Sequence, residues 1–145
     1  MAIDRIDWHA DSAIEEGLDW DNAGTHIGIY LAWIVQNNLV GEIHLEESAE
    51  ELQLLKDRKI TGRDYLIELC DEKFWEEDLN AEGLAFTQYY YEGDAIYFGD
   101  YEEVLAQHGA GIYHVKNTWE NYDVMAKTID ERYQAWKLSK SIESK

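Results

Sequence analysis

The sequence predicts an all-α fold, a single compact domain of about six helices. Apolar residues recur at spacings of three and four along most of the chain, as they do on one face of a helix. Strand signals are weak: only the run GIYHV (111–115) could be extended, and it lacks a convincing partner strand. A length of 145 residues without repeat, linker or proline suits one domain, so we expect residues 1–145 to form one unit.

Residues 23–38 predict a central buried helix. Apolar side chains lie nearly all round it, and a helix without a polar face is normally covered by its neighbours. These side chains are Ile27, Ile29, Tyr30, Leu31, Trp33, Ile34 and Val35. Gly24 and Gly28 are four residues apart and so share one face of the helix. We therefore expect a second helix to approach closely at these glycines.

The middle of the chain is expected to contain further helices. Each is predicted from a residue whose side chain can cap the helix N-terminus, followed by an apolar stripe. The predicted caps are Ser48 (in a capping box with Glu51), Thr61 and Asn80. The helix after Asn80 is expected to run towards Tyr90 and to stop at Gly93, because glycine is common just after a helix. A short helix over 101–107 is expected to end at Gly109.

Residues 118–138 predict a long amphipathic C-terminal helix. Asn117 and Glu120 form a candidate N-cap pair. The apolar stripe that follows places aromatic rings on one face for about five turns. It consists of Trp119, Tyr122, Ala126, Ile129, Tyr133 and Trp136. The polar tail 139–145 is expected to fray.

The charge is strongly negative and unevenly distributed. The chain has 31 acidic and 12 basic residues, a formal net charge of −19. No lysine or arginine lies between Arg5 and Lys56 or between Lys73 and Lys116. An acidic surface repels nucleic acid and anionic membranes and attracts cationic partners. We therefore expect a cationic protein partner, no nucleic acid and no membrane; in a second interpretation the acidic surface only keeps the protein soluble.

Compartment signals favour a cytoplasmic protein. The N-terminal residues lack the basic and apolar regions of a signal peptide. The longest apolar run, 27–35, is well short of the ~20 residues that span a bilayer. Cys70 is the single cysteine, which excludes an internal disulfide and fits a reducing environment.

Motifs for metal or cofactor binding are absent. None of the five histidines forms an H-x-x-x-H or H-E-x-x-H pair, so we predict no metal, no cofactor and no catalytic residue. His26 is expected to be buried and bonded to a backbone carbonyl or an acid. The alternative is a small enzyme or ligand-binding domain with a pocket around His26 and His9. Cys70 precedes Asp71 and Glu72, whose charge disfavours a thiolate, and is interpreted as a core residue.

The stretch 87–103 combines tyrosines and acids without a basic residue. Exposed tyrosines beside carboxylates make a good recognition surface, and we predict a partner-binding surface here. Its predicted residues are Tyr89, Tyr90, Tyr91, Glu92, Asp94, Tyr97, Asp100, Glu102 and Glu103. The alternative is a second aromatic layer of the core with tyrosine hydroxyls at its rim.

A set of short motifs links the chain to a family. They include Trp8-His9, Thr25-His26-Ile27-Gly28, Leu31-Ala32-Trp33, Thr61-Gly62-Arg63 and Thr118-Trp119-Glu120-Asn121-Tyr122. Over roughly 8–136 the chain resembles an uncharacterised family of small bacterial cytoplasmic proteins with a T-H-I-G-x-x-L-A-W signature. The resemblance implies no particular activity.

In size and charge, such small acidic proteins are similar to immunity proteins that neutralise interbacterial toxins, which is an analogy of type and not of motif. We therefore expect a non-enzymatic, cytosolic immunity protein. It would occlude the active surface of a cationic toxin, for example a nuclease.

Overall fold

The core of the computed structural model is built around α2 (Thr25–Gln36), in which every residue from Thr25 to Val35 is buried. The structure describes residues 2–106 and 111–143. The predicted central helix is confirmed, although it is shorter than 23–38 because Trp20–Gly24 form a 3₁₀ helix (η2) before it. The helix is buried because α4, α5, α8 and η2 all pack against it.

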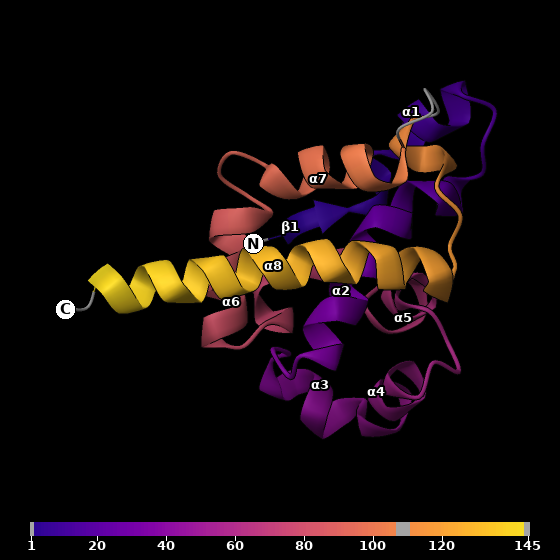
Figure 1. Ribbon diagram of the computed structural model, residues 1–145. Coiled ribbons are helices and arrows are strands. Elements are labelled where there is room, and N and C mark those ends of the chain that lie inside the picture. The colour runs from indigo at the N-terminus through magenta and orange to yellow at the C-terminus, as the bar shows by residue number, and fades with distance from the viewer. Residues whose placement is uncertain (1, 107–110, 144–145) are drawn as a thin grey trace.

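The described residues are mostly helical, as predicted, but contain more and shorter elements than six helices. The other α-helices are α1 (Ala10–Glu15), α3 (Glu42–Glu47), α4 (Ala49–Lys56), α5 (Gly62–Leu69), α6 (Ala81–Tyr90), α7 (Ile96–Leu105) and α8 (Trp119–Glu143). Three more 3₁₀ helices are η1 (Ile6–Trp8), η3 (Glu76–Asp78) and η4 (Ile112–His114). In Figure 1, α8 runs across the molecule, and its C-terminal end extends beyond the other elements.

A small sheet was not predicted. Strand β1 (Ala2–Arg5) pairs antiparallel with β2 (Lys73–Trp75), with Asp4 opposite Phe74 and Arg5 opposite Lys73. Strands of three or four residues are too short to show alternation, and the partner lies about 70 positions away in the chain. The run 111–115, the one candidate for extended structure, instead contains η4.

Two predicted helix caps are confirmed. Thr61 Oγ1 accepts a hydrogen bond from the Asp64 amide at 3.1 Å, and Asn80 Oδ1 accepts one from the Gly83 amide at 2.8 Å. The Ser48 prediction is wrong, because its side chain caps nothing at the start of α4. At the start of α8 the capping residue is Thr118, whose Oγ1 accepts a hydrogen bond from the backbone amide of Asn121. The side-chain amide of Asn117, the predicted cap, instead donates to Thr61 Oγ1.

The ends of two helices differ from the prediction. Helix α7 begins at Ile96, earlier than 101, and its predicted end at Gly109 lies outside the described residues. Helix α8 continues to Glu143, beyond the predicted end at 138. The buried side of α8 follows the predicted stripe and includes Tyr122, Ile129 and Tyr133.

The glycines of α2 permit the close packing that was predicted. A Cβ atom on Gly28 would lie 2.3 Å from the backbone nitrogen of Arg63, and one on Gly62 would lie 1.9 Å from the carbonyl oxygen of Gly28. Helices α2 and α5 therefore touch backbone to backbone. Gly24, the last residue of η2, instead faces side chains: a Cβ atom there would lie 2.6 Å from Ile6 Cδ1 and 3.6 Å from Leu66 Cδ2.

Candidate functional site

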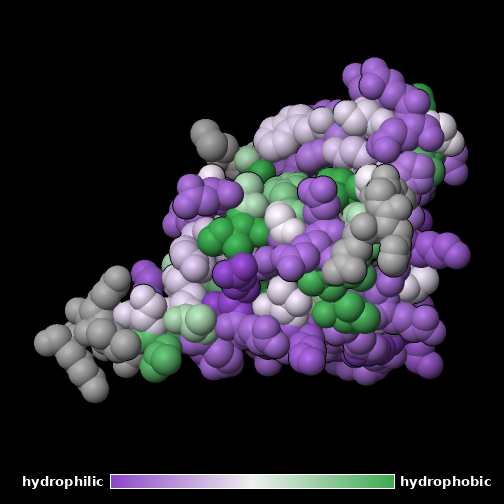
Figure 2. Space-filling model, turned by 45° about the horizontal axis from the view of Figure 1, so that its top comes forward, coloured by the Kyte–Doolittle hydropathy of each residue, from purple (hydrophilic) through white to green (hydrophobic). Residues whose placement is uncertain are grey.

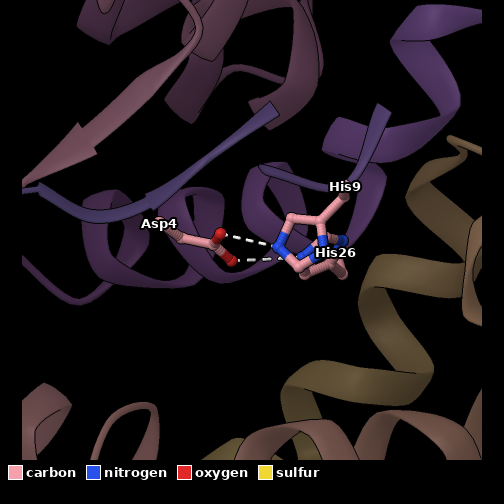
Figure 3. Close-up of side chains that lie close together, drawn as sticks. All are labelled: Asp4, His9 and His26. Carbon is pink, nitrogen blue, oxygen red and sulfur yellow. Dashed lines mark hydrogen bonds and ion pairs between the residues drawn. The ribbon is translucent and has the colours of Figure 1, made fainter. Parts of the chain in front are cut away.

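Three polar side chains from distant segments meet in the interior: Asp4 from β1, His9 between η1 and α1, and His26 from the first turn of α2. We call them the Asp4 cluster (Figure 3). His9 Nε2 lies 2.7 Å from Asp4 Oδ1, and His26 Nε2 lies 3.2 Å from Asp4 Oδ2. Because a carboxylate only accepts hydrogen bonds, each histidine donates from Nε2.

The Asp4 carboxylate accepts two further hydrogen bonds. The Arg5 amide donates to Oδ1 at 2.8 Å, and the Tyr91 hydroxyl donates to Oδ2 at 2.5 Å. Each oxygen therefore has two donors, which fills the lone pairs that point outwards. His9 Nδ1 is held in turn by the Tyr113 hydroxyl at 2.8 Å. The cluster thus ties β1, α1 and the end of α6 to the central helix.

Burial and hydrogen bonding set the ionisation of the cluster. Burial alone would raise the pKa of Asp4, but the hydrogen bonds from His26 and His9 hold it well below its usual value of 3.8. Burial lowers the pKa of His26 below 6.5, against the opposing effect of Asp4. The His26 side chain has no exposed area, and its Nδ1 has no hydrogen-bond partner among the described residues. An ionised Asp4 beside a neutral His26 follows.

The donor atoms of Asp4, His9 and His26 all lie within 4.8 Å of one another, so they could hold a metal ion. Two histidines and a carboxylate are a known ligand set for iron and zinc. The four donors already bonded to Asp4 make a metal-free hydrogen-bond network the better description. The prediction that His26 is buried and bonded to an acid is confirmed.

A second group of the same kind consists of His44, Cys70 and Asp78, all buried. His44 shares a hydrogen bond of 2.7 Å with the Tyr65 hydroxyl through Nδ1 and one of 2.7 Å with Asp78 Oδ1 through Nε2.

The roles of Asp4 and Asp78 were not predicted from the sequence. Asp4 lies 22 positions from His26, and Asp78 lies 34 positions from His44. No local spacing motif therefore marks either carboxylate.

Comparison of the sequence with models of protein families identifies the family of this chain. The model described as Domain of unknown function (DUF7832) matches residues 2–115. The chain belongs to this family. The expected membership of an uncharacterised family is thereby confirmed. No curated protein and no solved structure is similar enough to count as a match.

The matched part of this DUF7832 chain contains both histidine clusters and ends before α8. Within the residues that the structure describes, no helix has the length and apolar character needed to cross a membrane. Hydrophilic residues cover most of the face that Figure 2 shows, and hydrophobic residues gather there in smaller patches.

The predicted tyrosine surface of the DUF7832 chain needs correction. Tyr90, Tyr91 and Tyr97 are buried, because their rings pack around Tyr30 in the core. Their hydroxyls donate to buried acceptors: Tyr90 to Asp100, Tyr91 to Asp4, and Tyr97 to the carbonyl of His26. These three rings form the aromatic core layer that was the alternative interpretation.

Asp100 is also not part of a free acidic surface. It is buried and takes two hydrogen bonds of 2.9 Å from Arg132 of α8. The other predicted residues of this stretch are exposed: Tyr89, Glu92, Asp94, Glu102 and Glu103.

An open groove of about 740 Å³ lies between α3 and the segment that joins η3 to α6. Val40, Ile43, Leu45 and Leu79 supply its apolar lining. Ile43 and Leu45 are 47% and 53% exposed, which is high for large apolar side chains. Glu42 and Glu77 line the same groove, so it combines apolar surface with carboxylates.

Replacing His26 by alanine is expected to lower the free energy of unfolding by ~1–3 kcal/mol, because Asp4 loses a buried donor. Urea unfolding of wild type and variant measures the change. His114→Ala is the control, since His114 is exposed and should matter by less than ~0.5 kcal/mol. Equal stabilities with abolished function would contradict a structural role for His26.

The stability of the DUF7832 chain is expected to fall as the pH falls below 6.5. The pKa values of His26 and Asp4 are both lowered on folding, so the unfolded chain binds more protons. The contribution of His26 is complete above pH 6.5 and is lost below it, and that of Asp4 is lost below pH 3.8. Urea midpoints between pH 4 and 8 measure the contribution of His26, and His26→Gln should flatten this part of the curve. A midpoint that rises on acidification would contradict the assignment.

Proposed function

We propose that this chain is a non-enzymatic binding protein, a cytosolic immunity protein that occludes the active surface of a cationic interbacterial toxin, for example a nuclease. The observation that carries the proposal is the open groove beside α3, where exposed apolar side chains lie next to carboxylates. A binding surface needs an apolar centre that excludes water and polar groups that set specificity. The groove offers both on one face.

Ile43 and Leu45 supply the apolar part of this proposed surface. Helix α3 holds them at its exposed side while His44, between them, points inwards and is buried. Glu42 and Glu77 favour a basic segment of the partner over an acidic one, because opposite charges across an interface set partner choice. The partner chemistry that fits is a cationic protein segment carrying apolar side chains.

The exposed acids of the α6–α7 region support the same partner chemistry. No ion pair to Glu92, Asp94, Glu102 or Glu103 occurs within residues 2–106 and 111–143. Charges that are not neutralised locally contribute to the long-range field that steers a cationic partner. The predicted acidic surface is therefore kept in the proposal, with Tyr89 as its exposed aromatic residue.

A second candidate is a small enzyme or ligand-binding domain, favoured by the meeting of His9 and His26 at Asp4. His9 retains 19% of its side-chain exposure, so a ligand can reach the edge of the cluster. In that case His9→Ala would abolish a measurable activity of the isolated chain without a matching loss of stability.

Co-expression with the product of the adjacent gene tests the immunity proposal. That product should be toxic alone, and the wild-type chain should restore growth and co-purify with it. Leu45→Arg should abolish both effects, because a cation then lies in the groove. The matched control is Leu54→Arg, which changes another exposed leucine, 43% exposed, on α4.

Three outcomes would overturn the proposal. They are a neighbouring product that is harmless by itself, a failure of the two chains to co-purify, and a Leu45→Arg variant that protects as well as Leu54→Arg. The last result would remove the groove from the interface.

A further inference from the structure

His44, Cys70 and Asp78 come together from three separate segments. His44 lies in α3, Cys70 follows α5, and Asp78 ends η3. All three are buried, and one donor atom from each lies within 4.8 Å of the other two. His44 Nε2 and Asp78 Oδ1 are 2.7 Å apart. We propose that these three side chains bind a zinc ion.

The types of ligand atom in this cluster favour zinc over other metal ions. A thiolate, an imidazole and a carboxylate are the three ligand types that zinc takes in proteins, whereas magnesium and calcium prefer oxygen alone. Zinc is tetrahedral in most protein sites, and three protein ligands leave one position for water or another ligand. Small shifts of His44 and Asp78 away from each other make room for the ion between them.

Outer hydrogen bonds already orient two of the ligands. His44 Nδ1 lies 2.7 Å from the Tyr65 hydroxyl, which leaves Nε2 as the nitrogen that faces the site. Asp78 Oδ2 accepts the Trp75 amide at 2.7 Å, which leaves Oδ1 as the oxygen that faces the site. Metal-binding histidines and carboxylates are commonly held by such partners, which fix the ring and the carboxylate in place.

A pocket gives the ion a way in. The three side chains line a partly open pocket of about 240 Å³. Glu47 and Asp71 line it too, and both are exposed acidic residues. Their negative charge attracts a cation towards the buried ligands. The pocket also provides space for the fourth ligand.

The Asp4 cluster serves as a control for the proposed zinc site. Its carboxylate already accepts four hydrogen bonds, two of them from groups other than the histidines. It also lacks a sulfur ligand. A variant of His9 therefore changes a histidine–aspartate cluster in the same chain without touching the proposed zinc site.

Cobalt(II) titration of the full chain, followed by displacement with zinc, tests the proposal. We expect one cobalt ion per chain, with a cobalt–thiolate charge-transfer band in the near ultraviolet and visible bands of tetrahedral intensity. Zinc should remove both. Cys70→Ser should lose the thiolate band, and His9→Gln should keep it. Tyr65→Phe should weaken binding by roughly 10–100-fold, because it removes the partner of His44.

Circular dichroism of each variant without metal shows that it is folded, and the melting temperature of the wild type should rise with zinc more than that of Cys70→Ser. The proposal is overturned if cobalt gives no thiolate band, if Cys70→Ser binds zinc as tightly as wild type, or if His9→Gln abolishes binding. These measurements use the chain alone, so their outcome is independent of whether it binds a toxin.

Discussion

Replacing Asp4 by alanine is expected to lower the free energy of unfolding by about 3–5 kcal/mol, because each buried donor left without an acceptor costs roughly 1–3 kcal/mol. The variant leaves four donors without an acceptor: His9 Nε2, His26 Nε2, the Tyr91 hydroxyl and the Arg5 amide. Three of them are side chains from different parts of the fold, so β1 loses its polar link to the core. Urea unfolding at pH 7 measures the loss.

Asp7→Ala is the matched control for Asp4→Ala. Asp7 lies three residues later, is exposed and pairs with Arg5 at 2.8 Å. Exposed ion pairs contribute ~0–1 kcal/mol, so this variant should stay close to wild type. If both variants lose the same stability, the Asp4 cluster does not hold the N-terminal strand in place.

Replacing Gly62 by alanine is expected to destabilise the fold by about 3 kcal/mol or more. The new Cβ would lie 1.9 Å from the Gly28 carbonyl oxygen and 2.7 Å from its carbonyl carbon. Overpacking against side chains costs ~1–3 kcal/mol, and backbone atoms of two helices can give way less easily. Helices α2 and α5 would have to separate, which opens the centre of the core. The melting temperature and the urea midpoint should both fall.

Gly99→Ala provides the control for the loss of a glycine. Gly99 lies within α7, and a Cβ there would meet nothing within 4 Å. Alanine is favoured over glycine inside a helix by ~0.5–1 kcal/mol, so this variant should be slightly more stable than wild type. A Gly62→Ala variant that behaves like Gly99→Ala would contradict the close packing of α2 and α5.

The parts of the fold that the sequence predicted correctly depend on local patterns. Helix α2 was predicted to be buried because apolar residues lie on all its sides. The apolar stripe of α8 predicted which of its faces packs on the core. Thr61 and Asn80 predicted where two helices begin. The contact at Gly28 was predicted because small residues one turn apart permit close approach, although the partner could not be named. Each of these signals lies within one turn or a few turns of one helix.

The parts that were missed depend on tertiary contacts. Tyr90 and Tyr91 were interpreted as exposed because five acids surround them in the sequence, yet buried acceptors at Asp100 and Asp4 allow them into the core. The partners of His26 and His44 lie 22 and 34 positions away, so no spacing rule could identify them. A buried polar group needs a partner, but the sequence alone does not show which one.

The salt dependence of association with the toxin partner tests the proposed function most directly. The on-rate should fall steeply between 0.1 M and 1 M salt, because the Debye length shrinks from ~10 Å to ~3 Å. The off-rate should change much less, since apolar contacts in the groove are not screened. Neutralising Glu92, Asp94, Glu102 and Glu103 together should slow association at low salt. An on-rate that ignores both salt and these substitutions would show that the acidic surface does not guide a cationic partner.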